Sequence, residues 1–454
     1  MILEGVTRID EHGRTTTANV PIGAESDRFD ARGLVLAPGF IDLHAHLREP
    51  GFEESETVAT GARAALRGGF TTVCAMPNTQ PAIDSPGLVA EVLARARDAR
   101  AARVLPIATI TRGRRGTELA DLVELASAGA VAFSDDGDPV SDARLFRSAL
   151  EYARAAGRPI FEHSQDHALS VRGVMHEGRT SAELGLPGIP AAAEESAIAR
   201  DIALAKLAGS RLHIAHVSTA RGVELLRRAK AEGLPVTAEV TPHHLAMTDE
   251  WVAGSRTLAW DEDGSRRGDA AEGAGKEHSE RGTASASAMP YSTLTKVNPP
   301  LRTLADVRAC WEGLRDGTID AIATDHAPHV SVRKDVEYAE AAFGISGLET
   351  ALPLLLGAVA AGWAELGEVV RALVAGPARV LGMDVPSDDL VLIAPDVEWT
   401  VEPGALVSKG KNTPLMGRRL RGRVVMAVVA GEVRYADEKL LQGRVRATPT
   451  VARR

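Results

Sequence analysis

Two histidines two residues apart pose the first chemical question of this sequence. They are His44 and His46, within the segment PGFIDLHAHLREPG at 38–51. Side chains two residues apart in a β-strand point to the same face, so we expect both imidazoles to face one point. Two imidazoles at a strand end can hold a metal ion. A pair of hydrogen-bonded core histidines would give the same pattern, so further ligands have to be sought elsewhere in the chain.

Four more ionisable residues stand at or near the ends of later strand-like segments. Any one of them could be a packed polar residue, but six such residues at equivalent places are hard to explain that way. Four imidazoles and two carboxylates suit one or two divalent ions, of which zinc is the usual choice for nitrogen and oxygen ligands. We therefore predict a metal site. The four further residues are Asp136 in 130–136, His163 in 158–166, His216 in 211–219 and Asp325 in 321–329.

The segments that must position these residues alternate between two patterns. Apolar, β-rich runs alternate with Ala-, Leu-, Arg- and Glu-rich runs that often end in glycine, as helices do. Eight strands, each followed by a helix, is the count for an α/β fold of the TIM (β/α)8 barrel type, whose active site forms at the carboxyl ends of the strands. A doubly wound sheet is the structural alternative, but it rarely needs eight units. The predicted strands are 40–47, 70–78, 103–111, 130–136, 158–166, 211–219, 234–244 and 321–329.

The alternation stops at both ends of the chain. Residues 1–39 and 385–454 carry short strand-like runs without a helical period. We expect these termini to pack together as a small β-domain beside a barrel formed by residues 40–384. Within the barrel, residues from about 253 to 292 are rich in Gly, Ser, Ala and charged residues. Such a composition buries little apolar surface, so it predicts a flexible insertion.

The overall composition narrows the class of protein. The chain has 454 residues, 44% of them hydrophobic and 25% charged, as is ordinary for a soluble globular protein. A net charge of −9 offers no basic surface for nucleic acid or an anionic membrane. Two cysteines, Cys74 and Cys310, are too few for a disulfide framework or a cysteine-based zinc site. Without a signal peptide or a membrane-spanning apolar run, we expect a cytoplasmic enzyme with a small-molecule substrate.

Several long motifs resemble one enzyme family. The H-x-H on the first predicted strand, the histidines on the fifth and sixth and the aspartate on the eighth resemble the amidohydrolase superfamily. More narrowly, residues 31–435 resemble dihydroorotase, with an interruption at 253–292. The resemblance implies a hydrolase that interconverts N-carbamoyl-L-aspartate and L-dihydroorotate in de novo pyrimidine (UMP) biosynthesis. The motifs that carry it are FIDLHAHLREPG, TTVCAMPNTQP, VAFSDDG, AHVSTARG, EVTPHHL, KVNPPLR and ATDHAPH.

The resemblance also implies roles for the predicted ligands. Many amidohydrolases bridge two metals with a carboxylated lysine on strand four, but AVAFSDDGDPV has no lysine. Asp136 would bridge instead, as in class I dihydroorotases; its neighbour Asp135 points to the opposite face of an ideal strand, and the choice between them rests on the family pattern. Asp325 would also act as the catalytic residue that carries a proton from the attacking hydroxide to the departing nitrogen. One or two zinc ions, with two expected, would be held by His44, His46, Asp136, His163, His216 and Asp325.

A second set of residues is implied as substrate contacts. Arg48 could aim its planar guanidinium at the substrate carboxylate in a bidentate pair. The alternative is a surface arginine paired with Glu49. The family also implies a homo-oligomer, and association with an aspartate transcarbamoylase is left open. The implied substrate contacts are His46, Arg48, Asn78, Asn298, His329, Phe343 and Gly344.

Two other functions are open alternatives. A hydantoinase or allantoinase has the same fold, metals and cyclic-amide chemistry. Those relatives generally carry the strand-four lysine, and their substrates do not call for a carboxylate pocket of Arg48 and Asn78. A non-catalytic scaffold that binds aspartate transcarbamoylase is the other alternative. Such chains have usually lost metal ligands, whereas all six are present here.

Overall fold

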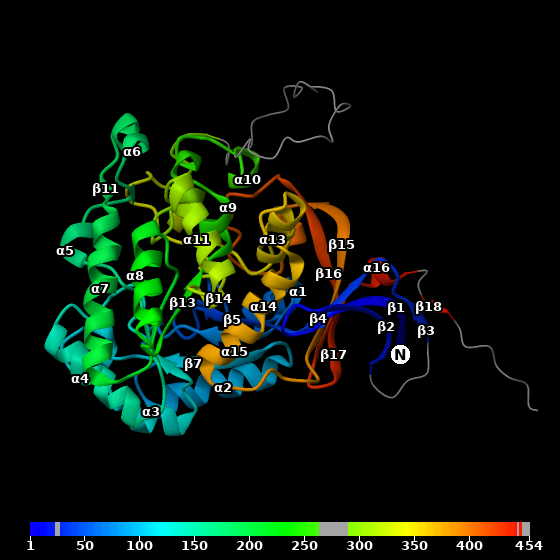
Figure 1. The fold of residues 1–454 in the computed structure, drawn as a ribbon, viewed down its shortest axis with the longest axis horizontal. Coiled ribbons are helices and arrows are strands. Elements are labelled where there is room, and N and C mark those ends of the chain that lie inside the picture. The colour runs from blue at the N-terminus through cyan, green and yellow to red at the C-terminus, as the bar shows by residue number, and fades with distance from the viewer. Residues whose placement is uncertain (23–27, 263–288, 443–444, 447–454) are drawn as a thin grey trace, which may run out of the picture.

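The computed structural model describes residues 1–22, 28–262, 289–442 and 445–446. In Figure 1 a barrel surrounded by helices occupies one side of the molecule and a curved β-sheet formed from both ends of the chain occupies the other. The predicted fold class, a (β/α)8 barrel with a small β-domain, is therefore confirmed.

Eight parallel strands form the barrel, and each pairs with the next along the chain. A parallel bridge between Ala45 and His326, with a 2.8 Å hydrogen bond from His46 N to His326 O, joins the first strand to the segment that follows the last. All eight predicted strands are present, but each is shorter than predicted because the chain turns into loops at the carboxyl ends. The strands are β5 (Phe40–Ala45), β6 (Phe70–Ala75), β7 (Arg103–Ala108), β8 (Ala132–Phe133), β9 (Ile160–Glu162), β12 (Leu212–Ile214), β13 (Val236–Val240) and β14 (Ala321–Ile322).

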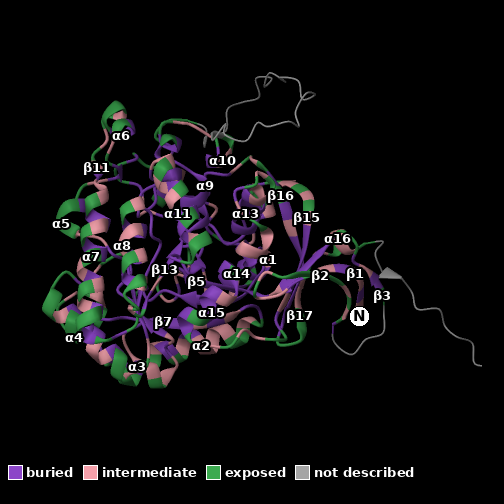
Figure 2. Cartoon of the chain, in the orientation of Figure 1, coloured by how far each residue is buried: buried purple, intermediate pink, exposed green. Residues whose placement is uncertain are grey.

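Helices cover the outside of the barrel, with buried faces toward the strands and exposed faces outward (Figure 2). Helix α1 (Val58–Gly68) shows how the sequence sets the helix ends. Thr57 and Thr60 form a capping box at its start, and Gly69 ends it with φ of 93°. No helix among the described residues is both long and apolar enough to cross a membrane. The main helices are α1 (Val58–Gly68), α2 (Pro86–Ala99), α3 (Leu122–Ala128), α4 (Ala143–Ala155), α7 (Ala191–Ala208), α8 (Ala220–Ala231), α11 (Leu304–Asp316), α13 (Ala351–Ala360), α14 (Leu366–Leu373) and α15 (Ala375–Leu381).

Short elements fill the loops that follow the strands. A two-stranded ribbon of β10 (Met175–His176) and β11 (Gly188–Ile189) lies between β9 and α7. The remaining short helices are α5 (His167–Ser170), α6 (Arg179–Leu184), α9 (Pro242–Ala246), α10 (Ala259–Glu262), α12 (Ser331–Lys334) and α16 (Glu438–Leu441), with 3-10 turns η1 (Arg112–Arg114), η2 (Asp249–Trp251), η4 (Thr293–Thr295) and η5 (Pro403–Ala405).

The interior of the barrel is a packed apolar plug below the strand ends. Ile41, Leu43, Ile107 and Phe161 are fully buried there and belong to one cluster with Cys74. Burying large side chains contributes about 1.5–3 kcal/mol each. The plug fills the barrel below the carboxyl ends of the strands.

The small β-domain joins the two termini in one mixed sheet. Leu36 and Leu392 pair antiparallel where the N-terminal and C-terminal strands meet. The strands are β1 (Ile2–Ile9), β2 (Thr15–Pro21), β3 (Arg28–Asp30), β4 (Val35–Pro38), β15 (Leu390–Thr400), β16 (Arg419–Val429), β17 (Glu432–Ala436) and β18 (Val445–Arg446).

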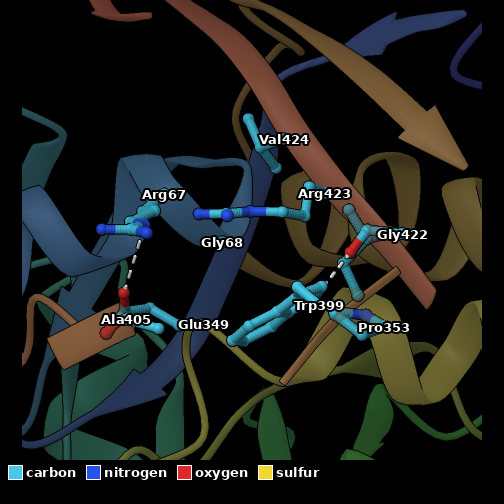
Figure 3. Close-up of a pocket in the computed structure, with 10 residues that line it drawn as sticks. Arg67, Gly68, Glu349, Pro353, Trp399, Ala405, Gly422, Arg423 and Val424 are labelled. Atoms are coloured by element: carbon cyan, nitrogen blue, oxygen red, sulfur yellow. Dashed lines mark hydrogen bonds and ion pairs between the residues drawn. The ribbon is translucent and has the colours of Figure 1, made fainter. Parts of the chain in front are cut away.

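Barrel and β-domain meet at a crevice lined by residues of both parts (Figure 3). Arg67 of α1 forms an ion pair with Glu349, with 3.7 Å between Nε and Oε1. On the other side of the crevice, Trp399 of β15 donates from Nε1 to Gly422 O at 3.0 Å, and the Arg423 guanidinium lies 5.3 Å from its ring centroid. The crevice is a junction between the two parts of the molecule.

The described residues include only the two ends of the predicted flexible insertion at about 253–292. Residues 263–288 lie outside the described residues. The flanks are described and carry apolar anchors: Leu258 and Ala259, at the start of α10, are buried against the barrel core. The segment 253–262 is therefore part of the packed structure.

Candidate active site

Six predicted ligands come together at the carboxyl ends of five strands. His44 lies in β5 and His46 just beyond it, and the other four follow β8, β9, β12 and β14 within three residues. Every one of the six is at most 5% exposed. Five of the six, all except His44, border a cavity of about 250 Å³, which is lined by His46, Arg48, Asn78, Asp136, Gly137, His163, His216, Asn298, Asp325, Ala327, His329, Ala342, Phe343 and Gly344.

One ligand group consists of His44, His46 and Asp325. His46 Nε2 lies 3.0 Å from Asp325 Oδ1, and His44 Nε2 lies 3.6 Å from the same oxygen. One ligand atom from each of the three lies within 4.8 Å of the others. Two imidazole nitrogens and a carboxylate oxygen at this spacing are a donor set that suits zinc.

A second group consists of His44, Asp136 and His216, again with one ligand atom each within 4.8 Å. Asp136 Oδ1 lies 3.4 Å from His44 Nε2 and 3.6 Å from His216 Nε2. His163 joins this side, with Nδ1 3.0 Å from His216 Nε2 and 3.7 Å from Asp136 Oδ1. Asp136 also reaches His46, 3.7 Å from Oδ2 to Nε2, so its carboxylate touches both groups.

Atoms that face the centre of this cluster have no hydrogen-bond partner within the described part of the chain. They include His44 Nε2 and Asp136 Oδ1. Buried polar atoms are normally hydrogen-bonded, and an exception asks for an explanation such as an ion. Both atoms are of ligand type, so the cluster fits a bound cation.

The charges of the cluster match that interpretation. Burial, followed by the neighbouring His216, lowers the pKa of His163 to about 4, which keeps this imidazole neutral and able to donate a lone pair. Burial would raise the pKa of Asp136, but His44 and His216 hold it well below its ordinary value. Burial likewise opposes ionisation of Asp325, and the bond from His46 overcomes it, so its pKa is also lowered. Both carboxylates are therefore ionised at neutral pH.

The backbone at the site adopts conformations that side chains other than glycine rarely occupy. His216 has φ of 35°, Asp325 of 45° and Arg48 of 63°. Such residues cluster at functional sites because surrounding contacts must offset the local cost. At each position the chain turns sharply as it leaves a strand.

Of the two adjacent aspartates, Asp136 is the one that faces the cluster. Asp135 points away and accepts bonds from the backbone nitrogens of Ile110 (2.8 Å) and Thr111 (3.1 Å) and from the Thr111 hydroxyl. Burial raises the pKa of Asp135 to about 6. It thus anchors the loop after β7.

Arg48 lines the same cavity. Its Nε donates to Pro328 O at 3.1 Å, and Nη2 lies 3.3 Å from His329 Nε2. Within the described residues no carboxylate pairs with it, because Glu49 forms its ion pair with Arg95. Burial lowers the pKa of Arg48 to about 10, so it keeps its charge at neutral pH.

The other predicted substrate contacts line the same cavity. Asn78 Oδ1 lies 2.8 Å from His46 Nδ1, and Asn298 Nδ2 lies 3.2 Å from His163 Nε2. His329 Nε2 lies 2.8 Å from Phe343 O, and burial with nearby Arg48 lowers the pKa of His329 to about 3. These residues thus connect the cluster to the outer wall of the cavity.

Glu239 is a site residue that sequence reasoning missed. From β13 its Oε1 lies 3.0 Å from His44 Nδ1, and its Oε2 lies 3.1 Å from His213 Nε2. A carboxylate on the outer nitrogen of a ligand histidine fixes the tautomer that turns the other nitrogen toward the metal. The available signal was a glutamate inside the apolar strand segment PVTAEV. The nearby His244 is structural, with ring nitrogens bonded to Thr241 Oγ1 and Pro299 O.

The sequence of this chain is similar to the sequences of known dihydroorotases. The family model described as Dihydro-orotase-like matches residues 33–222. The dihydroorotase of Anaeromyxobacter dehalogenans (strain 2CP-C) is 51% identical over 90% of this chain and 88% of its own. That of Pelotomaculum thermopropionicum is 47% identical over 96% of this chain and 93% of its own.

Solved structures show the same fold. The L-hydantoinase (dihydropyrimidinase) from Arthrobacter aurescens matches with a TM-score of 0.76 at 24% identity, covering 95% of each chain. The D-hydantoinase (dihydropyrimidinase) from Thermus sp. matches with a TM-score of 0.73 at 20% identity, covering 96% of this chain and 95% of its own. These likenesses concern the fold, whereas identity of about one half with proteins named dihydroorotase spans nine-tenths of the sequence. This chain belongs to the dihydroorotase family.

Proposed function

We propose that this protein is a dihydroorotase, which interconverts L-dihydroorotate and N-carbamoyl-L-aspartate in pyrimidine biosynthesis. Relatives of that name at 51% and 47% identity support the activity. One observation carries the substrate: a cavity that combines a metal-type cluster with the half-buried guanidinium of Arg48, which pairs with no carboxylate among the described residues. A cyclic amide that bears a carboxylate requires both features, one for the amide and one for the acid.

The proposed cofactor is zinc, with two ions per subunit. His44, His46, Asp136 and Asp325 would hold one ion, and Asp136, His163 and His216 the other. The carboxylate of Asp136 contacts both groups and segment 130–138 has no lysine, which supports the class I arrangement, in which Asp136 would help to hold both ions. A divalent ion at this place would supply a Lewis acid for the amide carbonyl and a nucleophilic water at neutral pH.

Proton transfer is proposed for Asp325. Its ionised carboxylate lies at the cavity edge beside His46, where it can accept a proton from the attacking nucleophile. It then delivers that proton to the ring nitrogen as the amide bond breaks, and the order is reversed in ring closure.

Substrate orientation is proposed for the outer wall. Arg48 would bind the carboxylate in a bidentate pair, which fixes the ring against the cluster. His329 lies beside Arg48 in the same wall, where it would add a hydrogen bond to the carboxylate. Asn298 and the backbone of Gly344 line the same wall and can meet the amide edge of the ring.

Ultraviolet-monitored turnover of L-dihydroorotate by the zinc-loaded full chain tests this function. We expect turnover of dihydroorotate and none of hydantoin or allantoin. Asp136→Ala should abolish it, because the carboxylate that touches both ligand groups is removed. Asp138→Ala, an exposed neighbour, is the matched control and should retain activity. Turnover of hydantoin in place of dihydroorotate would refute the substrate assignment.

A further inference from the structure

Two buried lysines stand behind the substrate side of the cavity, and the reaction as derived above does not use them. Lys296 follows η4 and is 2% exposed; Lys334 ends α12 and is 4% exposed. Lysine is almost never fully buried without a partner, because removing its charge from water is costly. Within the described residues neither forms an ion pair with a carboxylate. Their burial must therefore be explained by other hydrogen-bond partners.

The amino group of Lys334 is surrounded by backbone carbonyls. Its Nζ donates to Thr293 O at 3.1 Å, Lys296 O at 3.2 Å and Ala342 O at 2.7 Å. Three acceptors use every donor of an ammonium group. Burial, followed by the nearby cations Lys296 and Arg48, lowers the pKa of Lys334 to about 7. Three backbone carbonyl oxygens, and no carboxylate among the described residues, thus surround this amino group.

Those carbonyls belong to the two segments that carry the proposed substrate contacts. Lys296 lies two residues before Asn298, and Ala342 immediately precedes Phe343. The two segments also bond each other directly, through Gly344 N to Lys296 O at 2.9 Å. Lys334 thus ties both segments at the points where they enter the cavity wall.

Lys296 adds a contact in the same place. Its Nζ donates to Ala339 O at 2.8 Å and lies 4.5 Å from the ring centroid of Phe343. A cation over an aromatic face is attracted to it, which holds the Phe343 side chain against this segment. The backbone of Phe343 in turn contacts His329.

We propose that Lys334 is a positioning residue for substrate binding: its amino group holds the Asn298 and Phe343–Gly344 segments together so that both face the bound ring. The proposal rests on the proposed function, because it assumes that the ring occupies this cavity. Lys334 does not line the cavity, and its amino group bonds none of the proposed metal ligands, so we expect it to affect KM and not metal binding.

The test compares zinc-loaded full-length variants. For Lys334→Met, which removes the donors at similar length, we expect KM for L-dihydroorotate to rise about 10-fold, as loss of about 1.4 kcal/mol of binding implies. We expect kcat to stay within about threefold and zinc content to be unchanged. Lys334→Gln keeps two donors on a shorter chain, so its KM should rise less, by about threefold. The surface control Lys206→Met should behave as wild type.

Hydrogen exchange supplies a readout that a general loss of stability would not reproduce. The amide of Gly344 should exchange faster in Lys334→Met, while amides of β15 and β16 keep wild-type rates. An unchanged KM, or a fall in kcat with zinc loss and faster exchange throughout, overturns the proposal. If Lys334→Met does not fold, Lys334→Gln decides by the same two measurements. A wild-type chain without dihydroorotate turnover refutes the proposed function instead. The exchange rate of the Gly344 amide then still tests whether Lys334 holds the two segments together.

Discussion

The two walls of the cavity are held by different kinds of structure. On the metal side, His44 lies within a strand, and Asp136 and His216 follow within three residues of theirs. On the substrate side, Arg48 follows β5 by three residues, but Asn298 and Phe343 come from segments between helices and 3-10 turns. The hydrogen-bonded barrel fixes the positions of the strand ends, whereas the loops have to be held in place by separate contacts.

The contacts that hold the two walls also differ in chemistry. The metal side is joined by carboxylate–imidazole contacts, for example Glu239 with His44. The substrate side is joined by single side chains that bond several backbone groups, Lys334 among them. Changes on the first side should therefore alter zinc content and kcat, and changes on the second side should alter KM.

Asp325→Asn should give the largest effect, because this residue carries both proposed roles. The amide keeps the shape of the carboxylate but cannot accept the proton, and we expect kcat to fall on the order of 10³-fold. Steady-state assays with zinc measured by mass spectrometry check this. Full activity in the variant would show that Asp325 does not transfer the proton. A rise in KM alone would contradict the expectation that changes on the metal side alter zinc content and kcat.

Glu239→Gln should show that the metal side can be weakened without touching the substrate. The amide removes the charge that orients His44, and zinc affinity should fall about 10–100-fold. Competition with a chromophoric chelator measures the affinity. At saturating zinc, KM should match that of wild type. Glu224→Gln, at a half-buried position on α8 where the side chain pairs with Arg228, is the control, and equal affinities in the two variants would contradict the orienting role.

The same contrast explains what the sequence predicts well. Residues two apart in a strand share a face, so His44 and His46 could be paired from spacing alone. The choice of Asp136 over Asp135 needed the family pattern, because β8 is only two residues long and alternation gives little guidance there. Family motifs also supplied Asn298 and His329, whose loops have no period that local rules could use.

What the sequence did not predict depends on contacts between distant segments. Glu239 meets His44 across 195 positions of sequence. Lys334 bonds backbone carbonyls, which any residue type could provide. The residue types of its partners therefore give no sequence signal for its role. The start of α10 in the predicted flexible segment was missed as well, because two apolar residues suffice to anchor it. Burial of this kind follows from the fold and not from local composition.

Asn412→Ala tests the substrate side with the smallest expected effect. Asn412 Oδ1 accepts from His329 N and Ser346 Oγ, both at 2.8 Å, and Nδ2 donates to Ala327 O at 2.9 Å and Gly344 O at 3.0 Å. All four hydrogen-bonding positions of the amide are used. Removing them should lower the unfolding free energy by about 1–3 kcal/mol.

The kinetic consequence of Asn412→Ala should be confined to KM. Gly344 and His329 keep their other partners, Lys296 and Phe343, so a rise of about threefold is expected, with kcat and zinc content unchanged. Asn412→Asp keeps both accepted bonds and loses the donated ones, which separates His329 from Gly344 as the source of the change. Zinc loss in Asn412→Ala would mean that the two walls form one cooperative unit. A change in KM alone would mean that substrate affinity can be tuned through the loops while the metal ligands stay in place.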